Sequence, residues 1–190
     1  HVLGEDVVIV GLGHLGQLAV QYVRLLGPRV RLTIDPVARR VEMALRHGAS
    51  EGLATDVDQA LGRVRDITAG RMADVVYDMT GNAKVFAASQ LLLRVLGRQV
   101  LMGDTGYPSG QHISEAVITR SLTVLGCMGP QAPIESSNWY HWSRANMVDL
   151  FLHYLLDGRM RVTDLNTQAY SPADAQAAYQ KLLHDRGETM

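Results

Sequence analysis

VVIVGLGHLG, the stretch at residues 7–16, decides the fold of this chain. Its first four residues are apolar and β-branched, a pattern typical of a strand buried on both faces of a parallel sheet. Three glycines follow, and apolar residues then recur at helical spacing until Gly27-Pro28, which is a helix stop signal. The stretch therefore predicts a strand, a tight glycine turn and a helix in direct succession, as at the start of an α/β fold.

The same alternation continues through the first 130 residues. We expect strands at 7–10, 30–34, 52–55, 74–79, 99–102 and 122–127, and helices at 15–26, 37–47, 57–69, 83–96 and 113–120. Short connections between parallel strands give right-handed crossovers, so the pattern predicts a doubly wound, six-stranded parallel sheet of the Rossmann type.

The glycine turn predicts a site for the pyrophosphate of a nicotinamide dinucleotide. A strand precedes the turn and a helix follows it, which is the context that this motif requires. Gly11 allows the tight turn, Gly13 lets the backbone approach the pyrophosphate, and Gly16 lets the helix pack closely on the sheet. The backbone N–H groups of His14 and Leu15 are expected to face the phosphates at the positive end of the helix dipole. A glycine turn without a ligand is the alternative interpretation.

Asp35 lies 19 residues after the last of these glycines, directly after the second strand. A carboxylate there can accept both hydroxyl hydrogens of the adenosine ribose, and it repels a 2′-phosphate, which favours NAD over NADP. Arg39 and Arg40 follow on the next helix. Either one stacks on adenine or reaches the ribose, or both are solvated, and arginines at this place leave room for NADP.

After residue 130 the alternation stops. A polar loop at 130–138 precedes expected helices at 139–157 and 172–184. We therefore expect a dinucleotide-binding domain at 1–130 and a helical C-terminal segment at 131–190.

Composition excludes several classes of function. The chain has 190 residues, 47% of them hydrophobic and 19% charged, with a net charge of −1, which fits a globular protein and favours neither nucleic acid nor an anionic membrane as partner. No apolar run approaches the roughly 18 residues of a membrane helix. Cys127, the single cysteine, favours a reducing compartment, so we expect a cytoplasmic protein. The chain begins at His1 and stops at Met190 without a closing element, and we expect a piece of a longer protein.

The sequence resembles the zinc-type medium-chain alcohol and polyol dehydrogenases. The resemblance covers nearly the whole chain and is carried by an ordered set of segments. These are residues 7–16, VYDMTGN at 76–82, VLMG at 100–103 with LTVLG at 122–126, DGRMRV at 157–162 with YSPADA at 170–175, and the closing GETM at 187–190.

The resemblance implies further roles in the cofactor site. It implies that Asp35 binds the adenosine ribose beside Arg40, and that Leu15 lies against the back of the nicotinamide ring. Two further groups are implied: Met79, Thr80 and Gly81 lining the cofactor cleft, and Met102, Gly103 and Asp104 presenting backbone groups to the nicotinamide carboxamide. The sixth strand is expected to pair with its mate in a homodimer or homotetramer.

Family members carry their zinc ligands in a separate catalytic domain that this sequence lacks, and the C-terminal segment resembles the part that returns to it. We therefore expect no catalytic residue and no metal ligand here, with zinc held only by the missing domain. The leading interpretation is the NAD(H)-binding portion of an oxidoreductase acting on an alcohol or carbonyl substrate, inactive on its own. A zinc-free enone or quinone reductase of the same superfamily and a non-catalytic NAD-sensing module are the alternatives.

Other conspicuous residues favour structural roles. His141 has no second ligand at helical spacing, so a surface or interface histidine is expected. The aromatic cluster at 139–142 is expected to pack against the missing domain or a partner, and Cys127 to be buried and inert. Asp78 closes a strand at the ligand end of the sheet, where an acid is either functional or a loop cap.

Overall fold

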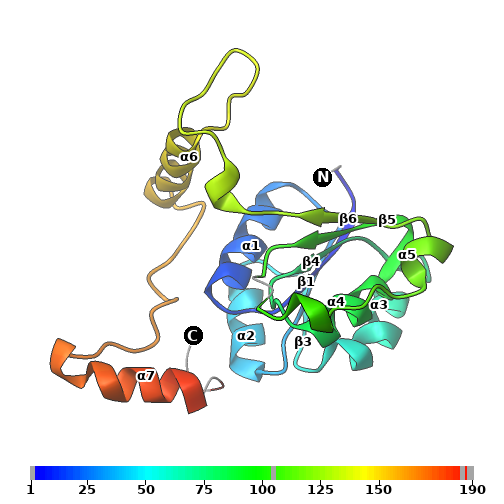
Figure 1. Cartoon of the computed structure of the whole chain (residues 1–190), viewed down its shortest axis with the longest axis horizontal. Coiled ribbons are helices and arrows are strands. Elements are labelled where there is room, and N and C mark those ends of the chain that lie inside the picture. Colours follow the sequence, from blue (N-terminus) through cyan, green and yellow to red (C-terminus); the bar gives the residue numbers. More distant parts are fainter. Residues whose placement is uncertain (1–2, 104–105, 185–186, 188–190) are drawn as a thin grey trace.

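The computed structural model describes residues 3–103, 106–184 and 187. It contains the predicted α/β fold, a six-stranded parallel sheet with strand order β3-β2-β1-β4-β5-β6 (Figure 1). The strands are β1 Asp6–Val10, β2 Val30–Ile34, β3 Glu51–Leu53, β4 Ala73–Asp78, β5 Leu93–Leu101 and β6 Thr123–Gly126. The order reverses beside β1, so the glycine turn after β1 opens at the switch point where α/β sheets bind ligands.

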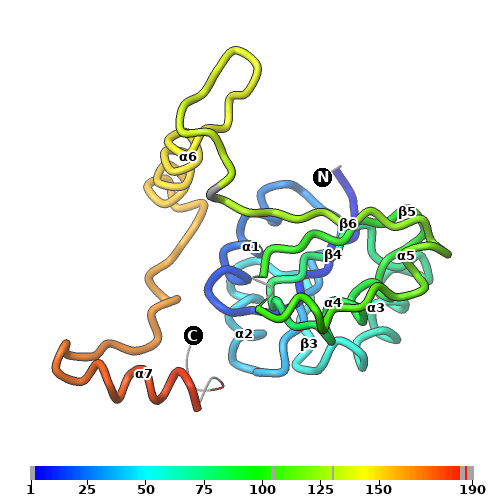
Figure 2. The backbone as a smooth tube through the Cα atoms, in the orientation of Figure 1, coloured from blue at the N-terminus to red at the C-terminus, as the bar shows by residue number. Residues whose placement is uncertain are grey.

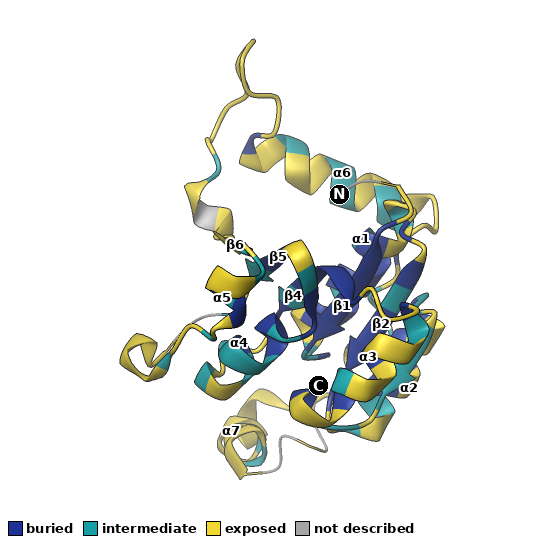
Figure 3. Ribbon diagram, turned by 90° about the vertical axis from the view of Figure 1, so that its right-hand side faces the viewer, coloured by how far each residue is buried: buried dark blue, intermediate teal, exposed yellow. Residues whose placement is uncertain are grey.

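Helices cover both faces of the sheet. The helices of the described chain are α1 His14–Leu25, α2 Ala38–Arg46, α3 Leu61–Ile67, α4 Ala83–Gln90, α5 Ala116–Thr119, α6 Arg144–Leu156 and α7 Ala175–His184. Short 3-10 turns lie at Val57–Ala60, Pro108–Gly110, Gly129–Gln131 and Pro172–Asp174. Successive residues of β1 point to opposite faces. Val7 and Ile9 pack under α1 and α2, whereas Val8 and Val10 pack with residues of α3 and β5. Burial on both faces explains the uninterrupted apolar run (Figure 3).

Several predicted helices are shorter than expected, and two of them differ most. The helix predicted at 83–96 ends at Gln90, because Leu93 is fully buried as the first residue of β5. The guanidinium of Arg120 donates to the carbonyls of Leu91 and Leu93 and so holds this change of direction. The helix predicted at 139–157 begins only at Arg144, where the Ser143 hydroxyl accepts from the backbone N–H of Asn146 at 3.2 Å as an N-cap.

The C-terminal segment leaves the sheet after β6 and passes through α6 and α7 beside it, as the tube in Figure 2 shows. No residue of either helix is buried. The segment is anchored on α1, where the ring of Tyr22 lies 6.4 Å from that of Phe151 and 6.3 Å from that of Tyr154. Met160 and Leu165 are buried beyond this contact. Among the described residues, no helix combines the length and apolar character needed to cross a membrane.

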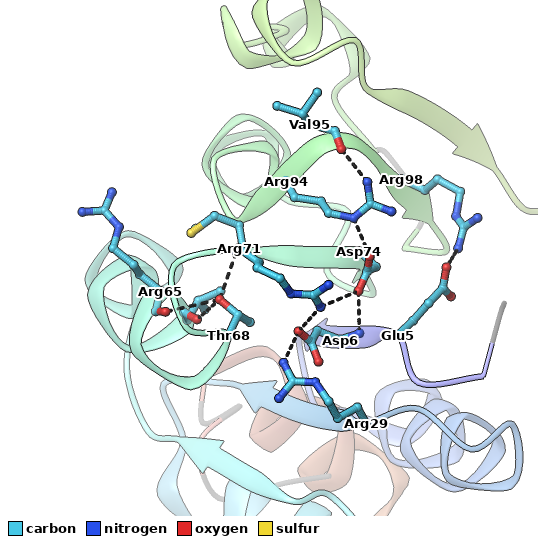
Figure 4. Close-up of polar contacts among 12 residues, drawn as sticks. Glu5, Asp6, Arg29, Arg65, Thr68, Arg71, Asp74, Arg94, Val95 and Arg98 are labelled. Carbon is cyan, nitrogen blue, oxygen red and sulfur yellow. Dashed lines mark hydrogen bonds and ion pairs between the residues drawn. The ribbon is translucent and has the colours of Figure 1, made fainter.

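The amino edge of the sheet is closed by alternating carboxylates and arginines (Figure 4). Asp74 accepts from the backbone N–H of Asp6 at 2.7 Å and from Arg94, while Arg71 lies 2.7 Å from Asp6 and 3.6 Å from Asp74. Arg29 pairs with Asp6 in the same cluster. Burial alone raises the pKa of Asp74, but these hydrogen bonds and the arginine charges outweigh it and lower the pKa. The ionised carboxylate therefore stabilises this edge.

Asp74→Asn is expected to lower the free energy of unfolding by about 1–2 kcal/mol at neutral pH, since the amide lacks the charge that holds the half-exposed arginines. The pKa of Asp74 is lower in the folded than in the unfolded chain. Its contribution is therefore present above the ordinary value of 3.8 and is lost as the pH falls through the folded-state value. Denaturant unfolding at a series of pH values measures this, with Asp66→Asn, at an exposed site, as the control. A difference between wild type and Asp74→Asn that stays constant into the acid range contradicts the assignment.

Candidate cofactor site

Two of the three glycines in the motif, Gly11 after β1 and Gly16 in the first turn of α1, are required by the fold itself. Gly11 has a φ of +90°, and a Cβ there meets Thr80 Cγ2 at 2.6 Å. A Cβ on Gly16 lies only 2.1 Å from the carbonyl oxygen of Gly11. Both positions therefore have to be glycine whether or not a ligand binds.

Gly13 differs from the other two. Its φ is −67°, which any residue adopts, and a Cβ there has no protein atom within 4 Å. Gly13 is the N-cap of α1, and the first backbone bond of the helix runs from the N–H of Gln17 to the Gly13 carbonyl at 2.9 Å. The N–H groups of the first turn precede that bond, so they lack intrahelical acceptors. An open approach to a helix N-terminus is the geometry expected for a bound phosphate, and the residues present fit a pyrophosphate.

A cavity of about 460 Å³ lies over this turn, within the range of about 300–1,000 Å³ that is typical of small-molecule sites. Of the residues predicted from the sequence, it brings together Gly11, Gly13, Asp35, Arg40, Met79 and Thr80. Asp56 and Asn82 also line it and were not predicted. The signal for them is that each follows a strand at the carboxyl edge of the sheet, where the loops converge.

Asp35 is buried and ties β2 to the glycine turn. One carboxylate oxygen accepts from the backbone N–H of Leu12 at 2.8 Å, and the other accepts from the N–H of Val37 at 2.9 Å. The guanidinium of Arg40 lies 3.8 Å from the first of these oxygens. Each carboxylate oxygen keeps a further lone pair, so the side chain is still able to accept from a ribose hydroxyl. The sequence predicted the ribose acceptor but not this second, structural use of the carboxylate.

The turn after β4 is joined to the end of β5. One Asp78 oxygen accepts from the N–H of Thr80 at 2.9 Å and from its hydroxyl at 2.7 Å, and burial raises the pKa of this carboxyl. The N–H groups of Met102 and Gly103 donate to the Asp78 carbonyl at 2.9 and 3.1 Å. A Cβ on Gly103 lies 2.2 Å from the nitrogen of Gly81, so these two turns touch. Of the two interpretations for Asp78, the contacts favour the loop cap.

The other predicted residues that the structure describes do not line the 460 Å³ cavity. Met102 and Gly103 line a second cavity of about 670 Å³, together with Cys127, Met128 and Tyr140. Asp104 lies outside the described residues.

The two predicted residues at the start of α1, His14 and Leu15, do not line that second cavity either. His14 lines a smaller cavity with Tyr170, and Leu15 is exposed on the first turn of the helix.

The expectation that Cys127 is buried was wrong. It is exposed at the end of β6, an edge strand whose four residues are all exposed, so no element covers the thiol. His141 and the aromatic residues near it are exposed, and Trp139 is 98% exposed. Within the described part of the chain, no three His, Cys, Asp or Glu side chains are grouped so that they could hold a metal ion.

Known proteins are similar to this chain over most of its length. The family model described as zinc-binding dehydrogenase matches residues 15–145. D-guloside 3-dehydrogenase from Escherichia coli K12 is 26% identical over 196 residues, which cover 98% of this chain and 53% of that protein. D-arabitol-phosphate dehydrogenase from Enterococcus avium is 26% identical over 182 residues, which cover 95% of this chain and 48% of that protein. The chain therefore spans about half the length of these curated relatives.

Solved structures share the fold. Alcohol dehydrogenase TADH from Thermus sp. ATN1 superimposes with a TM-score of 0.78 at 22% identity, over 99% of this chain and 50% of that one. A short chain alcohol dehydrogenase from E. coli CFT073, complexed with the cofactor NADH, gives a TM-score of 0.76 at 17% identity, over 99% and 51%. Together with the glycine turn, this fold defines the chain as a Rossmann-type α/β domain. Because the family model covers more than half of the sequence, the chain belongs to the zinc-binding dehydrogenase family, as the resemblance implied.

Proposed function

We propose that this chain is the NAD(H)-binding portion of a dehydrogenase that transfers hydride between nicotinamide and an alcohol or carbonyl group. The observation that carries the proposal is Gly13, the one glycine of the three that the fold does not require. The open space beside Gly13 leads to the first turn of α1. The buried Asp35, which follows β2, lines the same cavity. When bound, the nicotinamide supplies the hydride chemistry, and this chain binds and orients it.

The glycine turn and the family resemblance together suggest roles for individual residues. The first-turn N–H groups of α1, at His14 and Leu15, are proposed to hold the pyrophosphate, and Asp35 the adenosine ribose. Leu15 is proposed to lie behind the nicotinamide ring, with the turn at 79–81 lining the cleft. The backbone at 102–104 is proposed to bind the carboxamide.

NAD is proposed over NADP because a buried carboxylate at Asp35 repels a 2′-phosphate. The test is titration of the chain with NADH and with NADPH, followed by nicotinamide fluorescence. Tighter binding of NADH is expected, and failure to bind either nucleotide contradicts the proposal.

Substrate and zinc are proposed to be bound mainly by the rest of the enzyme, whereas partner subunits are proposed to contact this chain. The similarity to a D-guloside 3-dehydrogenase and a D-arabitol-phosphate dehydrogenase supports an alcohol or polyol substrate. Zinc is proposed for the other half, and a homodimer or homotetramer is proposed through β6, whose Val124 and Leu125 are exposed on an edge strand. A single cysteine supports a cytoplasmic location.

The chain alone is expected to show no alcohol dehydrogenase activity, even with zinc added. The described residues offer no group of metal ligands to polarise an alcohol oxygen, so binding of nicotinamide without turnover is the expected behaviour. The measurement is NADH formation at 340 nm with a panel of alcohols and polyols, using a sample whose NADH binding has been verified. Turnover above the buffer control contradicts this prediction.

A further inference from the structure

We infer that Gln17, His47 and Asp164 form a hydrogen-bonded relay that positions the glycine turn for the adenosine half of the cofactor, so that affinity depends on the docked C-terminal segment. The inference rests on the proposed function, since it concerns the same cofactor site. Its three members come from α1, from the C-cap of α2 and from the segment after α6.

Gln17 joins the two walls of the adenosine site. It lies on the first turn of α1 and is 0% exposed. Its Nε2 donates to the carbonyl of Leu12 in the glycine turn at 3.1 Å and to the carbonyl of Arg40 on α2 at 2.8 Å. Leu12 and Arg40 are the residues whose N–H and guanidinium approach the Asp35 carboxylate. One amide thus sets the spacing between the turn and the helix on either side of the proposed ribose acceptor.

His47 holds that amide in place. It is 3% exposed, and its Nδ1 lies 2.9 Å from Gln17 Oε1. Because Nε2 of Gln17 serves two carbonyls, the amide is not free to flip, and Oε1 only accepts. Nε2 of His47 lies 3.2 Å from both carboxylate oxygens of Asp164. The imidazole ring therefore connects the Gln17 amide at one nitrogen with the Asp164 carboxylate at the other.

Asp164 connects the relay to the C-terminal segment. Partial burial raises its pKa, but the hydrogen bond from His47 and the charges of His47 and Arg161 outweigh this and lower it, so the carboxylate is ionised. Arg161 lies 2.9 Å from Asp164, and its backbone makes two hydrogen bonds with the Gln21 side chain on α1, at 2.9 and 2.7 Å. Asp164 lines neither the 460 Å³ nor the 670 Å³ cavity. Any effect of Asp164 on the cofactor is therefore indirect, and His47 and Gln17 form its hydrogen-bonded route to the glycine turn.

Burying a polar group costs free energy of desolvation, and only complete hydrogen bonding offsets that cost. Apolar side chains of similar size would cover the same faces of α1 and α2 without that requirement. What they would not supply is a donor for the carbonyls of Leu12 and Arg40. The polar atoms end at the two carbonyls that flank Asp35, which assigns the relay to the positioning of the site.

The first experiment removes the remote end of the relay. Asp164→Ala in the full chain is expected to weaken binding of NADH, and of ADP-ribose to the same extent, by about fivefold, the value of one net hydrogen bond. Asp157→Ala is the matched control, because Asp157 is an ion-paired acid of the same segment that contacts Arg159 rather than the relay. Calorimetry measures both affinities. Equal losses for NADH and ADP-ribose place the effect on the adenosine half.

A second variant removes the near end of the relay. The double variant Gln17→Leu/His47→Leu leaves the carbonyls of Leu12 and Arg40 without this donor, so its denaturant midpoint is expected to fall. Its affinity for ADP-ribose, measured at a temperature where circular dichroism shows the variant folded, is expected to fall by about fivefold or more. If wild type binds NADH and both Asp164→Ala and the double variant bind it equally well, the relay is overturned and the proposed function stands. If wild type binds no nucleotide, the proposed function fails and the relay with it.

Discussion

Gly13→Val is expected to weaken NADH binding by at least about 100-fold while the chain remains folded. The isopropyl group points into the open approach at the N-terminus of α1 and excludes the pyrophosphate from the N–H groups of the first turn. Stability is expected to fall by only about 1 kcal/mol or less, since a Cβ at this position meets no protein atom within 4 Å and the N-cap preference is the main loss. Calorimetric titration and thermal unfolding of the same sample measure the two effects.

Gly16→Ala is the matched control, with the opposite expectation. Its single methyl group is placed 2.1 Å from the Gly11 carbonyl oxygen, and overpacking of this kind costs about 1–3 kcal/mol or more. Its midpoint should therefore fall further than that of Gly13→Val, although the new group is smaller. Unchanged NADH affinity in folded Gly13→Val removes the pyrophosphate from the glycine turn.

Asp35→Ala is expected to shift the ratio of the NADPH and NADH dissociation constants about 10- to 100-fold toward NADPH. The variant loses hydrogen bonds from the ribose hydroxyls to a charged acceptor, worth about 1.5–3 kcal/mol, and it no longer repels a 2′-phosphate beside Arg40. The N–H groups of Leu12 and Val37 also lose their acceptor, so the free energy of unfolding should fall by about 1–3 kcal/mol for each group left unsatisfied.

The affinity ratio separates these two consequences. Loosening of the glycine turn weakens both nucleotides, whereas loss of the ribose acceptor changes their ratio. Arg40→Ala serves as the control, because it leaves both backbone bonds of Asp35 intact and is expected to move the ratio in the opposite direction. If Asp35→Ala weakens both nucleotides equally, Asp35 is a structural cap and not a ribose ligand.

Much of the fold was predictable from local patterns. The run at 7–10 is apolar without interruption because β1 is central in the sheet, and the structure contains all six strands that were predicted. The family resemblance was likewise confirmed. What local patterns missed were boundaries set by tertiary contacts. Periodicity carried the helix predicted at 83–96 past Gln90, since nothing local reveals that Leu93 is buried in a strand.

The candidate site was predictable where a motif states its own geometry. The glycine spacing and Asp35 are local signals, and the structure places Gly11, Gly13 and Asp35 around one cavity. Gln17, His47 and Asp164 gave no such signal, because 117 residues separate the last two and only the folded segment brings them together. The exposed Cys127 was missed for a related reason. A sequence indicates that a strand is apolar but not that it lies at an uncovered edge of the sheet.

The contrast between Gly13 and the other two glycines, Gly11 and Gly16, also allows the site to be mapped with a library of variants. In a library that randomises the turn, selection for chains that merely fold should deplete every replacement at positions 11 and 16 and tolerate most of them at 13. Selection for nucleotide retention should deplete position 13 as well. Comparing the two selections separates the residues that folding requires from those that only nucleotide binding requires.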